Sequence, residues 1–361
     1  MIGAMDPAKP NPALYGVPYW SEEFNDMPYR RVGDSGLRAS AIGLGTWKFG
    51  HPDTGDGARV DERTAHRIFD RAIELGVTFW DTANRYNEAS GNSERVIGSW
   101  LAANPDQRRN VVLATKLCGG MDGHTPNHCG LSRTNITDAL HASLARLGQD
   151  YVDVLYFHRL DPDTPIAESL ETVEDLISRG LVRYLALSNA TVADLRAYAE
   201  VLGGASGAPM SRRARPVAVQ NKYDPLGREP AAFEGVLAHC ASNGIAFVPY
   251  SPLAGGLLTE RYLDLSNAGQ GDRLFDEGLL DRLATAQNVQ ILRSLAELAN
   301  RWGVGVSQLT LAYLLTLPGM GPQIPGASSV AQLESNASAG RLHLDEEQRT
   351  ALAAVFGSDP A

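Results

Sequence analysis

Short apolar runs alternate along the chain with longer segments in which apolar residues recur every three or four positions. The first pattern is typical of buried β-strands and the second of amphipathic helices. Parallel strands need crossover connections, so this alternation predicts a parallel sheet covered by helices. Eight such units within about 300 residues fit a closed (β/α)8 barrel, the TIM barrel. The strands are predicted at residues 41–45, 77–80, 111–114, 152–157, 182–187, 217–220, 245–248 and 323–325.

Glycines mark the ends of the predicted helices. Apolar residues follow one helical face over residues 65–75, 136–147 and 166–177, and a further helix is predicted over 231–243. Glycine readily adopts the left-handed conformation that follows a helix C-terminus. The glycines at these positions are Gly76, Gly148, Gly180 and Gly244.

Two segments depart from the alternation. Residues 29–32 and 37–40 are extended stretches on either side of a turn, which predicts an N-terminal β-hairpin. The longest interruption, residues 253–287, follows the seventh strand, and its several glycines are expected to let it act as a lid over a ligand. We expect residues 28–361 to form a single barrel, and residues 1–27 to be a poorly ordered extension that is partly vector-derived.

An open, doubly wound sheet is the main alternative fold. Such a sheet would carry a Gly-x-Gly-x-x-Gly fingerprint between its first strand and first helix. Here the first strand is followed by Thr46-Trp47-Lys48-Phe49-Gly50, which lacks that pattern. The barrel is therefore the predicted fold, and the carboxyl ends of its strands should form one active face.

Composition narrows the classes of function. The net charge of −10 and the pI near 5.3 argue against nucleic acid as a partner, because phosphate binding needs a basic face. The three cysteines form no Cys-x-x-Cys pair, which favours a reducing compartment. No apolar run is long enough for a membrane helix, and the N-terminal residues lack the apolar core of a signal peptide. We expect a cytoplasmic protein with a small-molecule partner.

Polar residues stand where the predicted strands end. Asp81 closes the second strand, with Tyr86 shortly after it, Lys116 follows the third and His158 the fourth. A phenol ordinarily has a pKa near 10, and a lysine within about 4–6 Å is expected to lower it. Asp81 would hold that lysine charged, and His158 would donate a hydrogen bond to a substrate carbonyl. Taken singly, each residue could instead be structural: a half-buried tyrosine, a rim lysine or a packed histidine.

The ordered set of motifs resembles the aldo-keto reductases from about Tyr29 to about Phe356. The matching stretches are residues 29–33 with 35–37, 43–47, 81–83 with Tyr86, 93–94 with 97–98, 144–147 with 151–153, 250–253 with Gly256, and 324–327. The resemblance implies that Tyr86 is the general acid/base, that Asp81 and Lys116 tune it, and that His158 orients the carbonyl. It also implies hydride transfer between a nicotinamide cofactor and an aldehyde, ketone or sugar-like alcohol.

The same resemblance implies a set of cofactor ligands. Ser188, Asn189 and Gln220 would bind the nicotinamide carboxamide, and Tyr250 would stack on its ring. The remaining expected cofactor contacts are Gly45, Thr46, Trp47 and Asp81, then Ser251, Pro252, Leu253 and Gly255 at the pyrophosphate, and Gly326, Ser328, Gln332 and Asn336 toward the adenosine. NADP(H) is the family default. Residues 326–336 contain no Lys or Arg, so NAD(H) or dual use is the rival.

The substrate pocket is expected to involve residues that flank the catalytic positions: Trp47, Trp80, Asn84, Arg85 and Arg159. The two arginines suggest a polar or acidic substrate, although salt bridges at the rim would explain them equally well. Oligomeric state is not readable from the sequence.

Two other classes of function are alternatives. One is a regulatory barrel, as in the beta subunits of voltage-gated potassium channels, which the family includes and which can retain the four catalytic residues. The other is a metal-assisted hydrolase, which would need histidine and carboxylate clusters at several strand ends, where the sequence offers one histidine. Cys118, His124, His128 and Cys129 share a loop without the spacing of a structural zinc site, so no metal is expected.

Overall fold

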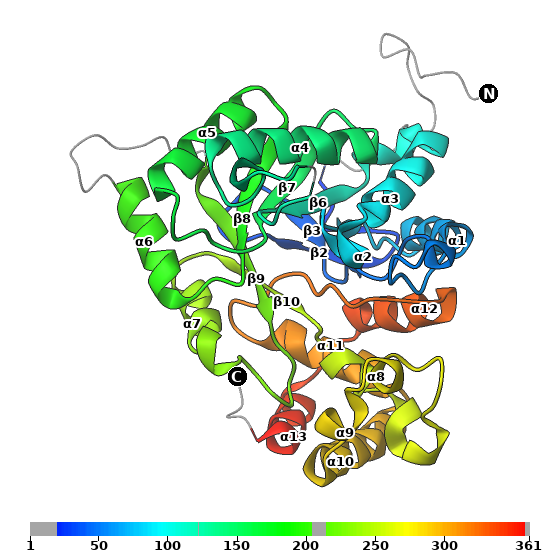
Figure 1. Cartoon of the computed structure of the whole chain (residues 1–361). Helices are drawn as coiled ribbons and strands as arrows, with labels where there is room; N and C mark the ends of the chain where they lie inside the picture. Colours follow the sequence, from blue (N-terminus) through cyan, green and yellow to red (C-terminus); the bar gives the residue numbers. More distant parts are fainter. Residues whose placement is uncertain (1–19, 122, 204–213, 358–361) are drawn as a thin grey trace.

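The computed structural model describes residues 20–121, 123–203 and 214–357. Seven parallel strands pair in chain order to form a nearly closed barrel, and helices surround it (Figure 1), so the chain is a (β/α)8 barrel. The strands are β4 (Leu44–Gly45), β5 (Phe79–Asp81), β6 (Val112–Leu117), β7 (Val152–Phe157), β8 (Val182–Ser188), β9 (Pro216–Lys222) and β10 (Ala246–Tyr250).

The eighth strand was predicted at residues 323–325, and here the prediction needs correction. Residues 320–326 close the barrel through isolated bridges, Ile42 with Gln323, Gly45 with Gly326 and Phe247 with Met320, rather than through a continuous strand. Proline has no N–H to give to a ladder, and residues 322 and 325 are both prolines. Close approach also matters at this seam, because a Cβ added to Gly45 would lie 2.9 Å from the carbonyl oxygen of Ile324.

The predicted helix stops are confirmed at all four glycines, which have positive φ. One prediction was wrong: the helix expected over 231–243 is a 3₁₀ turn followed by α7, because Gly235 between them has φ 82°. The helices are α1 (Glu62–Glu74), α2 (Tyr86–Ala89), α3 (Asn92–Ala103), α4 (Arg133–Leu147), α5 (Ile166–Ser178), α6 (Val192–Gly203), α7 (Val236–Ser242), α8 (Arg273–Asp276), α9 (Leu280–Leu283), α10 (Ala286–Trp302), α11 (Val306–Thr316), α12 (Val330–Ser338) and α13 (Glu346–Phe356).

The predicted hairpin is present as β2 (Met27–Arg31) and β3 (Arg38–Ser40), with β1 (Glu23–Phe24) added at its edge. It packs at the amino-terminal end of the barrel, where the backbone N–H of Asp34 donates to the carbonyl of Gly244 at 2.8 Å. Val32 and Ala39 join the apolar cluster inside the barrel. The hairpin therefore closes the end opposite the expected active face. The rest of the expected extension, residues 1–19, lies outside the described residues.

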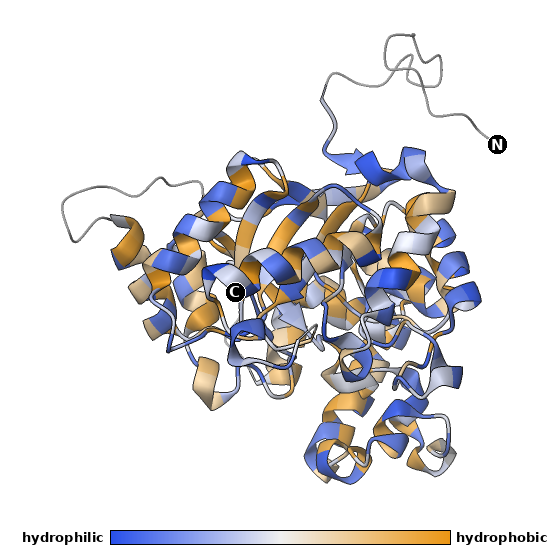
Figure 2. Ribbon diagram, turned by 45° about the horizontal axis from the view of Figure 1, so that its top comes forward, coloured by the Kyte–Doolittle hydropathy of each residue, from blue (hydrophilic) through white to orange (hydrophobic). Residues whose placement is uncertain are grey.

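The long interruption after β10 folds into short elements rather than an irregular loop. It contains three 3₁₀ turns, Ala254–Gly256, Glu260–Leu263 and Leu265–Asn267, followed by α8 and α9. Its apolar side chains share a second core with α10, α11 and α13 (Figure 1). We call residues 251–285 the excursion. Figure 2 shows apolar residues along the central strands and polar residues on outward helix surfaces, including those of this region.

Candidate active site

Three of the predicted catalytic residues meet at the ends of β5 and β6. The Lys116 Nζ donates to Asp81 Oδ2 at 2.6 Å, to the Thr82 carbonyl at 2.9 Å and to Tyr86 Oη at 2.6 Å. An ammonium has three N–H donors, so this cluster uses all of them. The lysine is fully buried, which fixes its geometry. Lys116 is thereby directed at the phenol oxygen.

Asp81 is bound from both sides. Its Oδ2 accepts from Lys116 and, at 3.2 Å, from the Tyr86 hydroxyl, while its Oδ1 accepts from Gln220 Nε2 at 2.7 Å. Gln220 was expected to bind a carboxamide, and its amide nitrogen here donates to the Asp81 carboxylate. The fold thus brings β9 into contact with the end of β5 across the barrel.

The pKa of Tyr86 differs from the expectation. Burial raises the pKa of the phenol well above its usual value because the phenolate is desolvated, and the charge of Asp81 adds to this effect. Burial lowers the pKa of Lys116, while Asp81 opposes that shift. The expected lowering of the tyrosine pKa was therefore wrong, because desolvation and the charge of Asp81 both raise it. Tyr86 is a protonated phenol at neutral pH.

His158 follows β7 and lies edge-on to Tyr86, with ring centroids 6.0 Å apart and an interplanar angle of 77°. Burial, together with charge repulsion from Lys116, Arg159 and Arg85, lowers the pKa of His158 to about 3. The imidazole is therefore neutral at physiological pH. A neutral ring carries one N–H donor, which suits a carbonyl oxygen.

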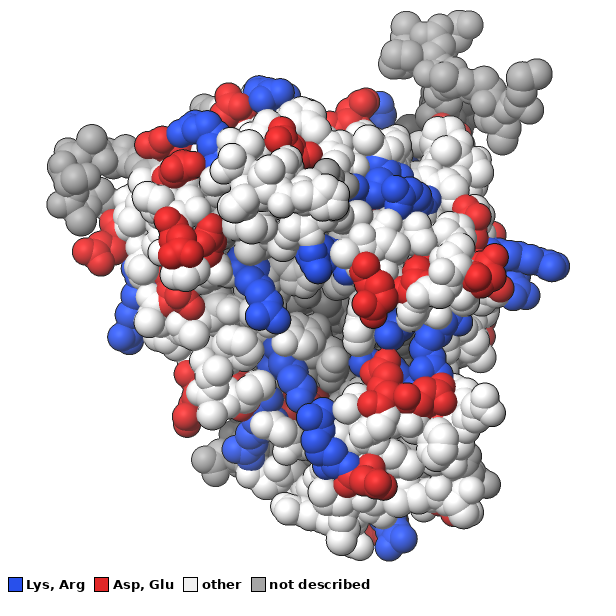
Figure 3. All heavy atoms as spheres, viewed as in Figure 1, with Lys and Arg blue, Asp and Glu red and all other residues white. Residues whose placement is uncertain are grey.

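A cleft of about 1120 Å³ opens at the carboxyl ends of the strands. Figure 3 shows a hollow on this face with Lys and Arg side chains along its edges. A volume of this size exceeds what one drug-sized ligand usually fills. The predicted residues that line it are Gly45, Trp47, Asp81, Arg85, Tyr86, His158, Arg159, Ser188, Asn189, Gln220, Tyr250, Ser251, Pro252, Leu253, Gly255, Gly326, Ser328, Gln332 and Asn336.

Trp80 does not line the cleft, which corrects the prediction. Its ring stacks on Phe69 with centroids 4.5 Å apart and meets Trp100 edge-on at 5.0 Å. Successive side chains of a strand point to opposite faces, so Asp81 at the cleft places Trp80 against the outer helices. Thr46 is also absent from the lining, because its hydroxyl donates to the Asp81 carbonyl at 2.9 Å beneath the surface.

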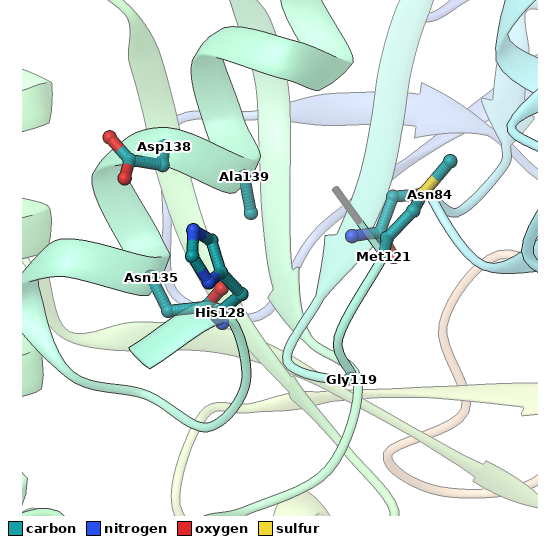
Figure 4. Close-up of a pocket in the computed structure, with 7 residues that line it drawn as sticks. All are labelled: Asn84, Gly119, Met121, His128, Asn135, Asp138 and Ala139. Atoms are coloured by element: carbon teal, nitrogen blue, oxygen red, sulfur yellow. The ribbon is translucent and has the colours of Figure 1, made fainter. Parts of the chain in front are cut away.

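Asn84 is the third expected lining residue found elsewhere. It is fully buried beside a separate cavity of about 20 Å³, with Asn84 and Met121 on one side and His128 and Asn135 on the other (Figure 4). Its side-chain nitrogen and oxygen have no hydrogen-bond partner among the described residues. A cavity of that size holds about one water molecule, not a substrate.

The expected carboxamide ligands are hydrogen-bonded to one another. The Ser188 hydroxyl donates to the Gln220 carbonyl at 2.8 Å, and Asn189 Nδ2 donates to the His158 carbonyl at 2.8 Å. The Tyr250 hydroxyl donates to Asn189 Oδ1 at 3.0 Å. These bonds connect the carboxyl ends of β7, β8, β9 and β10 along one side of the cleft.

The segment after β10 bends sharply along the cleft. Ser251, Ala254, Gly255 and Gly256 all have positive φ, between 51° and 111°. Successive left- and right-handed residues create a concave backbone of the kind that accepts anions. Some of its N–H groups are already used within the segment, that of Ala254 by the Ser251 carbonyl and that of Gly256 by the Leu253 carbonyl, so its role at a pyrophosphate stays a prediction.

Sequence reasoning missed four basic residues of the cleft: Lys48, Arg59, Arg261 and Arg273. Lys48 and Arg59 follow β4, whereas Arg261 and Arg273 belong to the excursion. The signal was present, because the segment identified as a lid carries several basic residues. The prediction for that segment used its glycines and left its basic residues out.

The cysteine–histidine loop shows no arrangement for a metal. Across residues 20–121, 123–203 and 214–357, no group of three or more His, Cys, Asp or Glu side chains could hold an ion. The His128 ring shares a hydrogen bond with Thr125 at 2.9 Å. Cys118, Cys129 and Cys240 are free. Among the described helices, none has the length and apolarity that crossing a bilayer requires.

The fold and the position of the site define the class of protein: a (β/α)8 barrel with a large ligand cleft at the carboxyl ends of its strands. Within that class, the chain belongs to the aldo/keto reductase family, whose model matches residues 41–356.

Three relatives illustrate the range of the family. The chain is similar to the L-glyceraldehyde 3-phosphate reductase of Escherichia coli K12, with 30% identity over 88% of this chain and 89% of the relative. It is 28% identical to the versiconal hemiacetal acetate reductase of Aspergillus parasiticus, over 89% of this chain and 95% of that protein. It is 31% identical to a probable voltage-gated potassium channel subunit beta of Arabidopsis thaliana, over 87% and 91% of the two chains.

Proposed function

We propose that this protein is a nicotinamide-dependent oxidoreductase that interconverts an aldehyde or ketone and its alcohol, including sugar-like alcohols, with Tyr86 as general acid/base. The observation that carries the proposal is the buried cluster of Asp81, Lys116 and Tyr86 at the floor of the cleft, with the phenol 2.6 Å from the ammonium. Reductase relatives of similar length support the reaction class.

The residues divide the proton chemistry between them. In reduction, Tyr86 donates its proton to the carbonyl oxygen, and the Lys116 ammonium stabilises the phenolate that forms. His158, held neutral, donates a hydrogen bond that orients the carbonyl. Asp81, anchored by Gln220, keeps Lys116 in place. In oxidation, Tyr86 takes the alcohol proton back.

The cleft fits a nicotinamide dinucleotide. Its volume suits a cofactor together with a substrate, and its wall offers amide, hydroxyl and aromatic groups at one end and the concave backbone of residues 251–256 beyond them. Ser188, Asn189 and Tyr250 would hold the nicotinamide, and Ser328, Gln332 and Asn336 the adenosine. Bound there, the reduced cofactor supplies a hydride to the carbonyl carbon.

We favour NADP(H) over NAD(H). Residues 326–336 lack a cation, but Arg261 and Arg273 line the same cleft from the excursion. Glu260 Oε1 accepts from the Val306 backbone N–H at 2.6 Å, which holds this part of the excursion against α11. Both arginines have a carboxylate partner, Asp272 and Glu277, but the Arg261 side chain is 57% exposed and keeps N–H donors for a 2′-phosphate.

The partner is proposed to be a small carbonyl compound, in a cytoplasmic setting. The substrates named for the relatives, L-glyceraldehyde 3-phosphate and a hemiacetal acetate, show the breadth to be screened. A second candidate is a regulatory barrel with weak or no turnover, which the similarity to a probable potassium channel beta subunit keeps open.

A fluorescence titration with NADPH and then NADH tests the proposal, because Trp47 lines the cleft and is 42% exposed. We expect saturable quenching, tighter with NADPH, followed by oxidation of NADPH when glyceraldehyde is added. Binding without turnover on a panel of aldehydes would favour the regulatory candidate. Absence of binding by either cofactor would refute both.

A further inference from the structure

Two arginines stand beside the catalytic groups at the mouth of the cleft. Arg85 directly precedes Tyr86, and Arg159 directly follows His158. Both side chains are exposed and both line the cleft. Both also lower the pKa of His158 by charge repulsion, so their charge acts on the face where a carbonyl would sit.

Among the described residues, these arginines differ from the other cations of the cleft in lacking a counter-ion. Lys48 lies 3.2 Å from Glu277, and the guanidinium of Arg59 lies 2.5 Å from Asp276. The other paired cations are Arg261, with Asp272, and Arg273, with Glu277.

For Arg85 and Arg159, by contrast, no carboxylate lies within 4.0 Å in the part of the chain that the structure describes. The rival explanation, that these arginines form salt bridges at the rim, is therefore not supported by the described residues. Asp81, the carboxylate at the floor, is already paired with Lys116.

The backbone around both arginines is fixed. A Cβ added to Gly119 would lie 2.4 Å from Arg85 Cδ, so the absence of a side chain there makes room for the arginine stem. On the other side, the His158 N–H donates to the Leu117 carbonyl at 2.8 Å. The His158 carbonyl accepts from Asn189, which holds the start of the loop that carries Arg159.

We infer that the substrate is a carbonyl compound that bears an oxyanionic group, a carboxylate or a phosphate, bound by Arg85 and Arg159 while Tyr86 and His158 face its carbonyl oxygen. The inference rests on the proposed function and names its substrate class. A guanidinium presents paired N–H donors that match both oxyanions, and such charge-assisted bonds are among the strongest a solvent-facing site can make.

Matched substrates test the inference. The first pair is glyceraldehyde and glyceraldehyde 3-phosphate, and the second is butanal and 4-oxobutanoate, each pair differing in one anionic group. At low ionic strength, we expect kcat/KM to be roughly 10- to 100-fold higher for the anionic member of at least one pair. Added salt should shrink the ratio, because exposed charges are screened. The pair with the larger ratio identifies phosphate or carboxylate as the preferred group.

Variants assign the effect to the two arginines. Arg85→Gln and Arg159→Gln should each raise KM for the anionic substrate about tenfold and leave the neutral partner within about twofold. Gly119→Ala keeps the charge but displaces the Arg85 stem, so it should lose part of the preference. Arg293→Gln, an exposed arginine of α10 outside the cleft, is the matched control and should change neither value.

The outcomes separate this inference from the proposed function. Equal kcat/KM for both members of both pairs would overturn the inference while turnover itself upholds the reductase. If no aldehyde turns over, a binding assay by tryptophan quenching decides. Quenching by glycerol 3-phosphate or succinate, but not by glycerol or butanol, would support the anion site. This quenching should be lost in the double variant Arg85→Gln/Arg159→Gln. Equal or absent binding of all four would refute it.

Discussion

The ion pairs at the floor of the cleft differ in exposure from those at its roof, the contact between the excursion and the loop after β4. At the floor, Lys116 and Asp81 pair at 2.6 Å with side chains only 1% and 2% exposed. At the roof, the excursion meets the loop after β4 through Arg59 with Asp276 and Lys48 with Glu277, whose side chains are 24% to 31% exposed.

This difference in exposure has a physical meaning. A buried ion pair is costly to break from one side, because the remaining charge stays desolvated. A partly exposed pair contributes about 0–1 kcal/mol, since water replaces the lost partner. We therefore expect the floor to hold Tyr86 in a fixed position, and the ion pairs of the roof to break at little cost.

The largest effect is expected at the floor. Tyr86→Phe removes the proposed proton donor and keeps the ring, so kcat should fall by about 10²- to 10⁴-fold. Cofactor affinity should stay close to that of the parent, which fluorescence titration would measure. Rates near the parent value would show that another group supplies the proton.

Lys116→Met breaks the buried pair from one side. We expect a loss of about 3–5 kcal/mol in the free energy of unfolding, because Asp81 is left without its counter-charge. Urea denaturation measures this loss. Adding Asp81→Leu should restore part of it, and a double variant no more stable than Lys116→Met would contradict the floor model.

His158 links the floor to the solvent-facing arginines through its pKa. The folded-state pKa of about 3 lies below the unfolded value near 6.5, so only the unfolded chain takes up this proton between those limits. Its contribution to stability therefore falls as pH decreases from about 6.5 toward 3. At pH 5 the loss should be about 2 kcal/mol.

His158→Asn should lack that contribution, so the stability difference between variant and parent should change between pH 7 and pH 5. His239→Asn is a useful comparison, because burial also lowers the pKa of His239, which does not line the cleft. Parallel stability curves for His158→Asn and the parent would show that the imidazole is not kept neutral by the fold.

The smallest effect is expected at the roof. A double-mutant cycle of Arg59→Met and Asp276→Asn should give a coupling energy below about 1 kcal/mol, together with a several-fold faster release of NADPH in stopped flow. The more exposed Arg179–Asp175 pair at the C-terminal end of α5 is a control outside the cleft and should leave release unchanged. A coupling of several kcal/mol would erase the contrast between roof and floor.

The sequence predicted what depends on local pattern and chain order. The barrel, the hairpin and the helix stops follow from periodicity and glycines, and consecutive parallel strands place Asp81 and Lys116 side by side. Trp80 was misplaced because the alternation of a strand was not applied to a residue next to Asp81.

Other features depend on contacts between distant residues. Gln220 reaches Asp81 across the barrel, a separation of 139 residues. The direction in which the Tyr86 pKa shifts depends on how deeply the phenol is buried, and sequence spacing does not give that depth. The counter-ions of Lys48 and Arg59 likewise come from the excursion, and the lack of one at Arg85 becomes visible only when these elements are assembled.

We expect the seam of the barrel, where residues 41–45 meet residues 320–326, to couple ligand binding to local unfolding. Its two sides meet through few bonds, among them Gly43 N–H to the Gln323 carbonyl at 2.7 Å, and Gly45 and Gly326 on either side both line the cleft. A ligand that contacts both Gly45 and Gly326 binds only when the seam is closed, so its binding free energy stabilises the closed seam against local opening. Amide hydrogen exchange at Gly43 and Gln323 should slow when the cleft is filled, while exchange in the continuous β7–β8 ladder should change less.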